Sequence, residues 1–182
     1  LWQSPFTLHQ RVIEAIRREA ALAREGKQGR IIAKMNALLE PDTIEALYDA
    51  SRAGVKIDLI VRGVCALRPG MEGLSENIKV RSIIGRFLEH HRVFYFYASG
   101  EEKVYLSSAD WMERNFFKRI ELAFPILDPK LKKRVIDEGL TPYLEDNVHA
   151  WAMDQHGAYR CESPQQGKPR GAQDALLERL AR

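Results

Sequence analysis

The sequence has few of the features that mark a membrane-spanning, secreted or disulfide-bonded protein. It contains two cysteines in 182 residues, Cys65 and Cys161, and no Cys/His spacing typical of zinc. No apolar run approaches the ~20 residues of a transmembrane helix, and no charged-then-apolar leader opens the chain. These absences favour a reduced, cytosolic setting, and neither cysteine is predicted to be catalytic.

Neither positively nor negatively charged residues are in large excess. Lys plus Arg total 28 against 25 for Asp plus Glu, a net charge of +3, which is too balanced for a chain that wraps nucleic acid through bulk electrostatics. With 45% hydrophobic and 29% charged residues, the composition fits a globular domain with a sizeable core.

Hydrophobic periodicity predicts strands that alternate with helices. Thr7 and Gln10 form a capping-box pattern before the first helix, and a strand–helix–strand series over about 35 residues predicts parallel strands with a right-handed crossover. The expected strands are 30–35, 55–61, 78–84, 93–97, 103–106 and 119–126, and the expected helices are 8–25, 41–54, 129–138 and 172–181. The fold class is therefore α/β, a mixed β-sheet flanked by helices.

The composition changes near the end of the chain, where residues from Asp154 onward are polar and rich in Gly, Pro and Gln. We expect residues 1–153 to form the domain, and residues 154–182 to form a polar C-terminal extension with a short final helix. Because the chain begins at Leu1 rather than Met, we also expect it to be part of a longer protein.

Arg62 is the first candidate for binding a ligand. It stands at the carboxyl end of the predicted strand 55–61, where ligands gather in open α/β sheets. Its guanidinium stays ionised and presents fixed donors that suit phosphate oxygens. A salt bridge to Asp58 or to another acid at the sheet rim is the structural alternative.

His90 and His91 lie just before the aromatic strand 93–97. Histidine titrates near neutrality, which suits proton transfer or attack on phosphorus, and adjacent residues of a strand cannot share one face. A surface or capping role is the alternative for each. No further ligands with metal spacing accompany them, so no metal ligands are predicted in this chain.

Polar residues also follow the strand 103–106. Ser107, Ser108 and Asp110 could bind an anion at a helix start or simply cap that helix. Arg119 and Glu121, two positions apart on the predicted strand 119–126, share a strand face and could form a surface pair.

Four strings carry a family resemblance: KMN (34–36), DLIVRGVCALRPG (58–70), SENIKVRSIIGRFLEHHRVFYF (75–96) and VYLSSADWMERN (104–115). Together they closely resemble the carboxy-terminal catalytic region of the long polyphosphate kinases. The likeness runs from about residue 1 to residue 147, and several long strings match in order.

The resemblance implies a phospholipase-D-like fold and a reaction, the reversible transfer of the terminal phosphate of ATP to inorganic polyphosphate through a phosphohistidine. This chain resembles the second of two related catalytic domains, and the phosphorylated histidine would belong to the preceding one. His90 matches the second catalytic histidine, an acid/base partner that also contacts nucleotide phosphates. Arg62 matches an arginine that binds those phosphates.

The resemblance also implies the partners and a wider set of site residues. The partners would be ATP or ADP, polyphosphate and the preceding domain of the same chain, in a homo-oligomer that is cytoplasmic or peripheral at the membrane, with no transmembrane segment. Mg²⁺ would be the cofactor, with its ligands outside this chain. The expected phosphate-binding residues are Arg62, His90, Arg81, Arg86, Arg119, Lys34 and Asn36, with Ser107, Ser108, Asp110 and Glu121 as secondary members.

Two other functions compete with this hypothesis. One is a non-catalytic module that binds polyphosphate or nucleic acid in the same basic groove. The other is a phospholipase-D-like nuclease or phosphodiesterase, which would need a His-x-Lys pair. Neither His90 nor His91 has a lysine two positions on, which counts against the phosphodiesterase.

Overall fold

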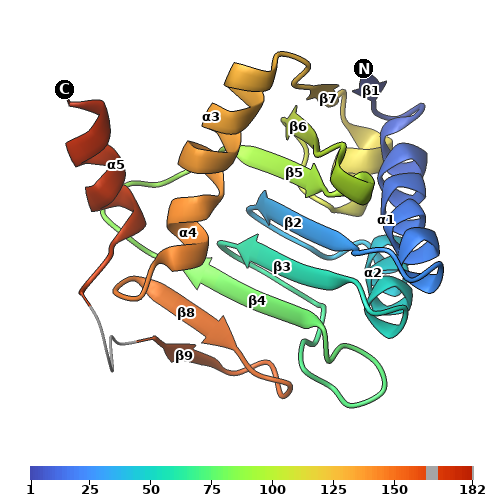
Figure 1. Ribbon diagram of the computed structural model, residues 1–182, viewed down its shortest axis with the longest axis horizontal. Helices are drawn as coiled ribbons and strands as arrows, with labels where there is room; N and C mark the ends of the chain where they lie inside the picture. Colours follow the sequence, from blue (N-terminus) through green and yellow to red (C-terminus); the bar gives the residue numbers. More distant parts are fainter. Residues whose placement is uncertain (163–167, 182) are drawn as a thin grey trace.

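One mixed β-sheet organises the part of the chain that the computed structural model describes, residues 1–162 and 168–181 (Figure 1). The strand order is β1-β7-β6-β5-β2-β3-β4-β8-β9. The strands are β1 (Trp2–Gln3), β2 (Arg30–Met35), β3 (Lys56–Val61), β4 (Ile78–Ile83), β5 (Arg92–Phe96), β6 (Lys103–Ser107), β7 (Leu122–Pro125), β8 (Ala150–Met153) and β9 (Tyr159–Cys161). The helices are α1 (Leu8–Arg24), α2 (Pro41–Arg52), α3 (Pro129–Gly139), α4 (Thr141–Glu145) and α5 (Ala172–Leu180), with helical turns η1 (Ala98–Gly100) and η2 (Arg114–Lys118).

The predicted strand–helix–strand unit is confirmed. β2 and β3 pair in parallel, with Arg30 opposite Lys56, and α2 connects them. α2 begins at Pro41 because Glu40 caps it, accepting from the main-chain N–H groups of Asp42 and Thr43. The predicted hairpin is also confirmed, since β5 and β6 pair antiparallel.

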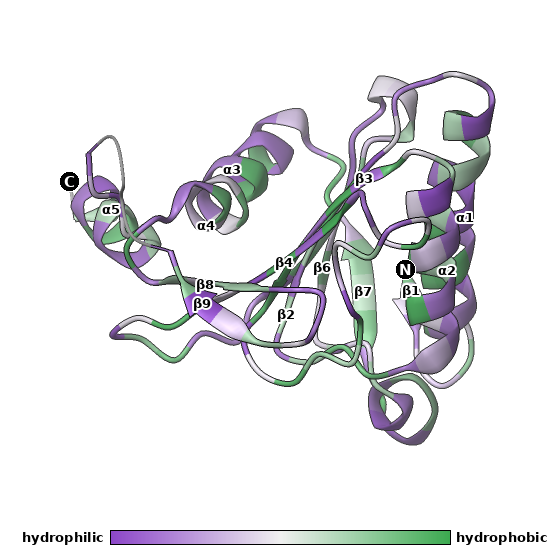
Figure 2. Cartoon of the chain, turned by 90° about the horizontal axis from the view of Figure 1, so that it is seen from below, coloured by the Kyte–Doolittle hydropathy of each residue, from purple (hydrophilic) through white to green (hydrophobic). Residues whose placement is uncertain are grey.

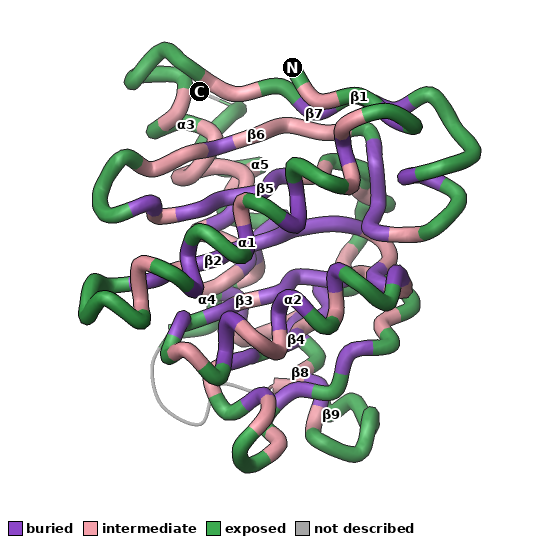
Figure 3. The backbone as a smooth tube through the Cα atoms, turned by 90° about the vertical axis from the view of Figure 1, so that its right-hand side faces the viewer, coloured by how far each residue is buried: buried purple, intermediate pink, exposed green. Residues whose placement is uncertain are grey.

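The helices cover the sheet on two faces: α1 and α2 on one, and α3, α4 and α5 on the other (Figure 2). β2 is buried on both sides, so Ile31 and Met35 pack towards α1 and α2 while Ile32 packs on the opposite face. Figure 3 shows β2 and β5 buried along most of their length. Burying each such aliphatic side chain contributes about 1.5–3 kcal/mol.

Two local predictions are wrong at the chain's start and in its middle. Thr7 makes no side-chain cap bond to α1; its Oγ1 instead accepts from the main-chain N–H of Gln3 at 3.1 Å. The strand predicted over 119–126 is shorter, because β7 covers only Leu122–Pro125. Arg119 and Glu121 therefore precede the strand, one exposed and the other buried.

The carboxyl-terminal part contains more structure than the sequence predicts. α4, β8 and β9 have no predicted counterpart, and the expected boundary after residue 153 falls between β8 and β9, which pair antiparallel. The final helix is confirmed as α5, which packs against the core cluster on the α3 and α4 face through Ala172 and Leu176. Among the described residues, no helix is both long and apolar enough to cross a membrane.

Candidate functional site

The polar residues of interest gather along one edge of the sheet. β2, β3 and β4 are parallel neighbours, so their carboxyl ends share this edge. β5 runs in the opposite direction, with Val93 opposite Lys34, so its first residues lie there too. Arg62 at the end of β3 and the loop 84–91 before β5, named here the histidine loop, therefore meet at one edge.

Glu89 of the histidine loop forms a buried ion pair with Lys34. Lys34 Nζ lies 2.8 Å from Glu89 Oε2 and 4.3 Å from the centre of the Tyr143 ring. The Tyr143 hydroxyl donates to Glu89 Oε1 at 2.7 Å. This cluster joins β2, α4 and the histidine loop.

The two charges of this pair alter each other's ionisation. Burial lowers the pKa of Lys34, and the ion pair with Glu89 offsets part of that effect. Desolvation raises the pKa of Glu89, but the hydrogen bonds from Lys34 and Tyr143 outweigh it and hold that pKa below its usual value. The ion pair therefore favours the charged form of each partner, against the burial that disfavours it.

A second chain of contacts runs from Arg62 to the backbone of His90. Arg62 Nε donates to Asn36 Oδ1 at 2.9 Å, and the Asn36 main-chain N–H donates to Asp110 Oδ1 at 2.7 Å. Asp110 also holds Arg92 through Nε and Nη2, at 3.2 and 3.1 Å.

Arg92 completes the link, because its Nη1 donates to the carbonyl oxygen of His90 at 2.6 Å. The network therefore fixes the backbone of His90 while leaving its ring exposed. Within the described part of the chain, no protein acceptor contacts the two Nη groups of Arg62. The Arg62 guanidinium is planar, and its two Nη groups can donate parallel hydrogen bonds to an anion such as phosphate.

The two histidines have different surroundings. The ring of His91 lies against Tyr143, with ring centres 5.4 Å apart. Desolvation and then the charge of Lys34 lower the pKa of His91 to about 4. His91 is therefore uncharged at neutral pH. Both residues are exposed, so the two histidines differ in the contact with Tyr143 and not in their access to solvent.

Three of the predicted basic residues take other positions. Arg81 donates from Nη1 to the main-chain carbonyls of Tyr143, Leu144 and Asp146, at 3.3, 2.8 and 3.4 Å, which commits that nitrogen to supporting α4. Arg86 is exposed on the histidine loop, 5.5 Å from the centre of the Phe87 ring. Arg119 is exposed before β7.

The predicted helix start after β6 is wrong, since Ser107 and Ser108 form no helix. Ser107 Oγ donates to the carbonyl of Leu122 at 2.9 Å. Ser108 and Asn115 both donate to the buried Glu121. These contacts hold β6 and η2 against β7, whereas Asp110 alone of this segment joins the Arg62 network.

Several residues of the site carry no sequence signal that identifies them. Glu89 contacts Lys34 across 55 positions and Tyr143 across 54, and Arg92 meets Asp110 across 18. The packing of β2, α4 and the histidine loop reveals the pairs of Glu89, and the pairing of β5 with β6 brings Arg92 to Asp110. The sequence gives one hint for Arg92: it stands two positions after His90, where a His-x-Lys pair would have its lysine.

The edge is a poor site for a magnesium ion, which requires free oxygen ligands. Both oxygens of Glu89 and of Asp110 already accept from Lys34, Tyr143, Arg92 or a main-chain N–H. The donor set therefore does not fit Mg²⁺.

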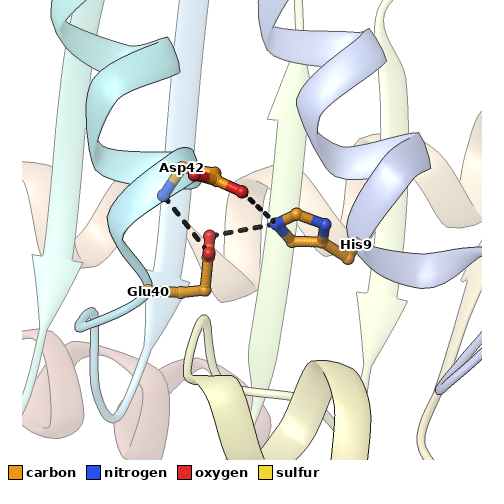
Figure 4. Close-up of side chains that lie close together, drawn as sticks. All are labelled: His9, Glu40 and Asp42. Atoms are coloured by element: carbon orange, nitrogen blue, oxygen red, sulfur yellow. Dashed lines mark hydrogen bonds and ion pairs between the residues drawn. The ribbon is translucent and has the colours of Figure 1, made fainter.

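Elsewhere in residues 1–162 and 168–181, one group of side chains lies close enough to hold a cation: His9, Glu40 and Asp42, whose ligand atoms are within 4.8 Å of one another (Figure 4). His9 Nε2 is 3.1 Å from Glu40 Oε2 and 4.0 Å from Asp42 Oδ2. Both Glu40 oxygens already accept from the first turn of α2. We assign the group a structural role that ties α1 to the start of α2.

A pocket of about 250 Å³ adjoins Arg62 on the side of β4 and β8. It is lined by Arg62, Gly63, Ser82, Ile84, Trp151 and Tyr159. Ser82 Oγ donates to the main-chain carbonyl of Arg62 at 2.8 Å, which fixes the backbone at that point. His90 is not among the residues that line this pocket.

The two cysteines take no part in the edge. Cys65 is partly buried and Cys161 is exposed. Burial raises the pKa of the Cys65 thiol to about 11, so it is protonated at neutral pH and a poor nucleophile.

The fold defines the class of this domain, which is phospholipase-D-like. A phospholipase D family member, NUC from Salmonella typhimurium, aligns with 84% of this chain and 95% of its own, with a TM-score of 0.58. The two are 16% identical, so the likeness shows the fold alone.

Within that class the chain belongs to the polyphosphate kinase family. The family model described as "Polyphosphate kinase C-terminal domain 2" matches residues 1–173. The crystal structure of a polyphosphate kinase from Porphyromonas gingivalis matches with a TM-score of 0.94 and 40% identity, over 98% of this chain and 27% of that one.

Curated relatives agree with the family. A polyphosphate kinase from Paraburkholderia phytofirmans is 66% identical over 177 residues, 97% of this chain and 26% of the relative. One from Burkholderia multivorans is 69% identical over 160 residues, 88% of this chain and 23% of the relative. The chain therefore spans about a quarter of the length of these relatives.

The low pKa of His91 gives a direct spectroscopic prediction. We expect its ring to remain neutral until the pH falls to about 4. Replacing Lys34 by Met removes a nearby cation and should raise that pKa, whereas Glu89→Gln removes the attracting anion and should lower it further. The measurement is an NMR titration of the His91 C2 proton, assigned with His91→Asn. Lys130→Met, at an exposed position of α3, is the control, and a His91 resonance that Lys34→Met leaves unmoved would contradict the assignment.

Proposed function

We propose that the full-length protein containing this chain reversibly transfers the terminal phosphate of ATP to inorganic polyphosphate. In the first half of the reaction, a histidine outside residues 1–182 attacks the terminal phosphorus of ATP, and ADP departs. In the second half, a terminal oxygen of polyphosphate attacks the phosphohistidine, the N–P bond breaks and the polymer is one phosphate longer. Membership of the family supports this reaction.

The observation that carries the role of this chain is the arrangement of Arg62 beside the histidine loop. Among the described residues, the hydrogen-bond network at this edge contains three cations, Lys34, Arg62 and Arg92, and two carboxylates, Glu89 and Asp110. Phosphoryl transfer depends on such cations placed around the migrating group. The surplus positive charge therefore favours a phosphate chain as the ligand.

In this proposal each residue has a distinct task. Arg62 binds nucleotide phosphate oxygens with its free Nη groups, oriented by Asn36. His90 exchanges a proton with the reacting phosphates. Lys34 contributes charge from within the network, and Arg86 and Arg119 add cations from the exposed rim.

The remaining partners lie outside this chain. We propose that Mg²⁺ is held by residues beyond 1–182, because the carboxylates at this edge are already occupied. The preceding catalytic domain would close over the edge, and the full-length protein would act as a homo-oligomer in the cytoplasm or at the membrane surface.

The test is an assay of the purified full-length protein with ATP and polyphosphate. We expect ADP formation together with chain growth, and ATP formation when ADP and polyphosphate are supplied. We expect no hydrolysis of a phosphodiester such as bis(p-nitrophenyl) phosphate, since Arg92 replaces the lysine of a His-x-Lys pair. Binding of polyphosphate without turnover, and equally of single-stranded DNA, would instead favour the non-catalytic module.

A further inference from the structure

One side chain of α5, Gln173, forms hydrogen bonds with the histidine loop. Gln173 stands in the first turn of this helix and is 5% exposed. Its Oε1 accepts from the main-chain N–H of Phe87 at 2.8 Å, and its Nε2 donates to the Phe87 carbonyl at 2.9 Å. One amide therefore satisfies both main-chain polar groups of Phe87, as a neighbouring strand would.

The same amide also reaches the ion pair of the site. Gln173 Nε2 lies 3.1 Å from Glu89 Oε1, which the Tyr143 hydroxyl also contacts. Glu89 thus collects donors from β2, α4 and α5. Glu89 and Phe87 lie one and three positions before His90, so Gln173 holds the part of the loop that precedes His90, whereas Arg92 holds the carbonyl of His90 itself.

Gly85 shows how closely the loop and this side chain fit. A Cβ atom at position 85 would lie 2.4 Å from Gln173 Oε1 and 2.7 Å from its Cδ. Real Cβ atoms do not approach other atoms so closely, so any side chain at 85 would displace the amide of Gln173. The glycine and the glutamine form a matched pair across 88 positions of sequence.

α5 has an anchor of its own, independent of Gln173. The main-chain N–H of Ala172 donates to Asp146 Oδ2 at 2.7 Å, and Asp146 is 1% exposed. Asp146 Oδ1 accepts from the N–H groups of Val148 and His149, at 2.9 and 2.7 Å. Replacing the Gln173 side chain therefore leaves the start of the helix attached.

We infer that Gln173 is a positioning residue for phosphoryl transfer: through Phe87 and Glu89, α5 holds the histidine loop so that His90 meets the phosphates. The inference rests on the proposed role of His90. It assigns to the last helix, on the far side of the expected boundary at residue 153, a part in the catalytic step.

The experiment compares Gln173→Ala and Gln173→Glu in the full-length protein. We expect kcat to fall by about 10- to 100-fold, the size of effect that a misplaced catalytic group produces. The KM for ATP should change by less than about threefold, because the hydrogen bond that orients Arg62 comes from Asn36 and not from α5. Gln173→Glu keeps the shape but places an anion against Glu89, so it should be at least as damaging as Gln173→Ala. Glu178→Ala, exposed on the same helix, is the matched control.

A double-mutant cycle with Gly85 tests the contact itself. Gly85→Ala alone should reduce kcat by as much as Gln173→Ala, since its Cβ displaces the amide. The pair Gly85→Ala/Gln173→Ala should be no worse than Gln173→Ala, because the second substitution removes the clash. Strictly additive losses would overturn the inference, as would a kcat for Gln173→Ala within about twofold of the unaltered protein.

The proposed role of His90 can be tested separately from the contact that Gln173 makes. If His90→Ala retains full activity, the proposed role of that histidine is lost, whatever Gln173 does. Hydrogen exchange at the Phe87 amide then tests the contact: faster exchange in Gln173→Ala than in Glu178→Ala supports it, and unchanged exchange overturns it.

Discussion

Replacing His90 by Ala should lower the rate of phosphate transfer by about 10²–10⁴-fold in both directions, the usual contribution of a general acid or base. The ring is exposed, so its removal should leave the melting temperature unchanged. The backbone at this position should also persist, because Arg92 holds the His90 carbonyl from Asp110. The measurement is kcat of the full-length protein in the forward and reverse reactions.

His91→Ala is the matched control for this prediction. His91 is adjacent in sequence but lies against Tyr143 and stays neutral, so its loss should disturb packing and affect kcat less than His90→Ala does. Near-normal turnover by His90→Ala with a large loss in His91→Ala would transfer the catalytic role to His91. Near-normal turnover by both would remove the histidine loop from the chemistry.

The sequence predicts the central sheet well because its signals are local. The alternation of residues 55–61 and the Pro41 helix start each depend on a few neighbouring residues, and both the strand–helix–strand unit and the position of Arg62 at a strand end are confirmed. Parallel pairing then fixes which ends share an edge. The edge of the site could therefore be located without coordinates.

The contacts within the site could not be predicted in the same way. Arg62 was open to a salt bridge with Asp58, but Asp58 pairs with Arg30, leaving Arg62 to bind Asn36. Asp58 and Arg62 point to the same face but are four positions apart along the chain, about 13 Å in an extended strand, whereas Arg30 lies close to Asp58 on the neighbouring strand β2. Likewise Glu121 looks like half of a surface pair, yet it is buried as the acceptor for Ser108 and Asn115.

Short elements at the sheet's far end were missed for a different reason. β8 and β9 have four and three residues, too few for a hydrophobic period to emerge from the polar composition around them. The role of Gln173 could not be predicted from the sequence for a related reason: a single glutamine at a helix start is typical of ordinary surface sequence. Its role depends on a partner 86 positions away.

Replacing Arg62 by Ala should weaken nucleotide binding by about 1.5–3 kcal/mol, the value of a hydrogen bond to a charged group. That corresponds to roughly a 10- to 150-fold rise in Kd for ATP. In the described part of the chain the Arg62 side chain makes one hydrogen bond, from Nε to Asn36, so its loss should cost the fold little. The measurement is isothermal titration calorimetry of the full-length protein.

Two further variants separate the charge of Arg62 from its shape. Arg62→Lys keeps the charge but loses the fork and the bond to Asn36, so its Kd should fall between those of the unaltered protein and Arg62→Ala. Arg11→Ala removes an equal charge from exposed α1, where Arg11 pairs with Glu14 at 3.0 Å, and controls for net charge. If Arg62→Ala binds ATP no more weakly than Arg11→Ala, the two free Nη groups do not hold the nucleotide. An Arg62→Lys variant as tight as the unaltered protein would reduce the role of Arg62 to charge alone.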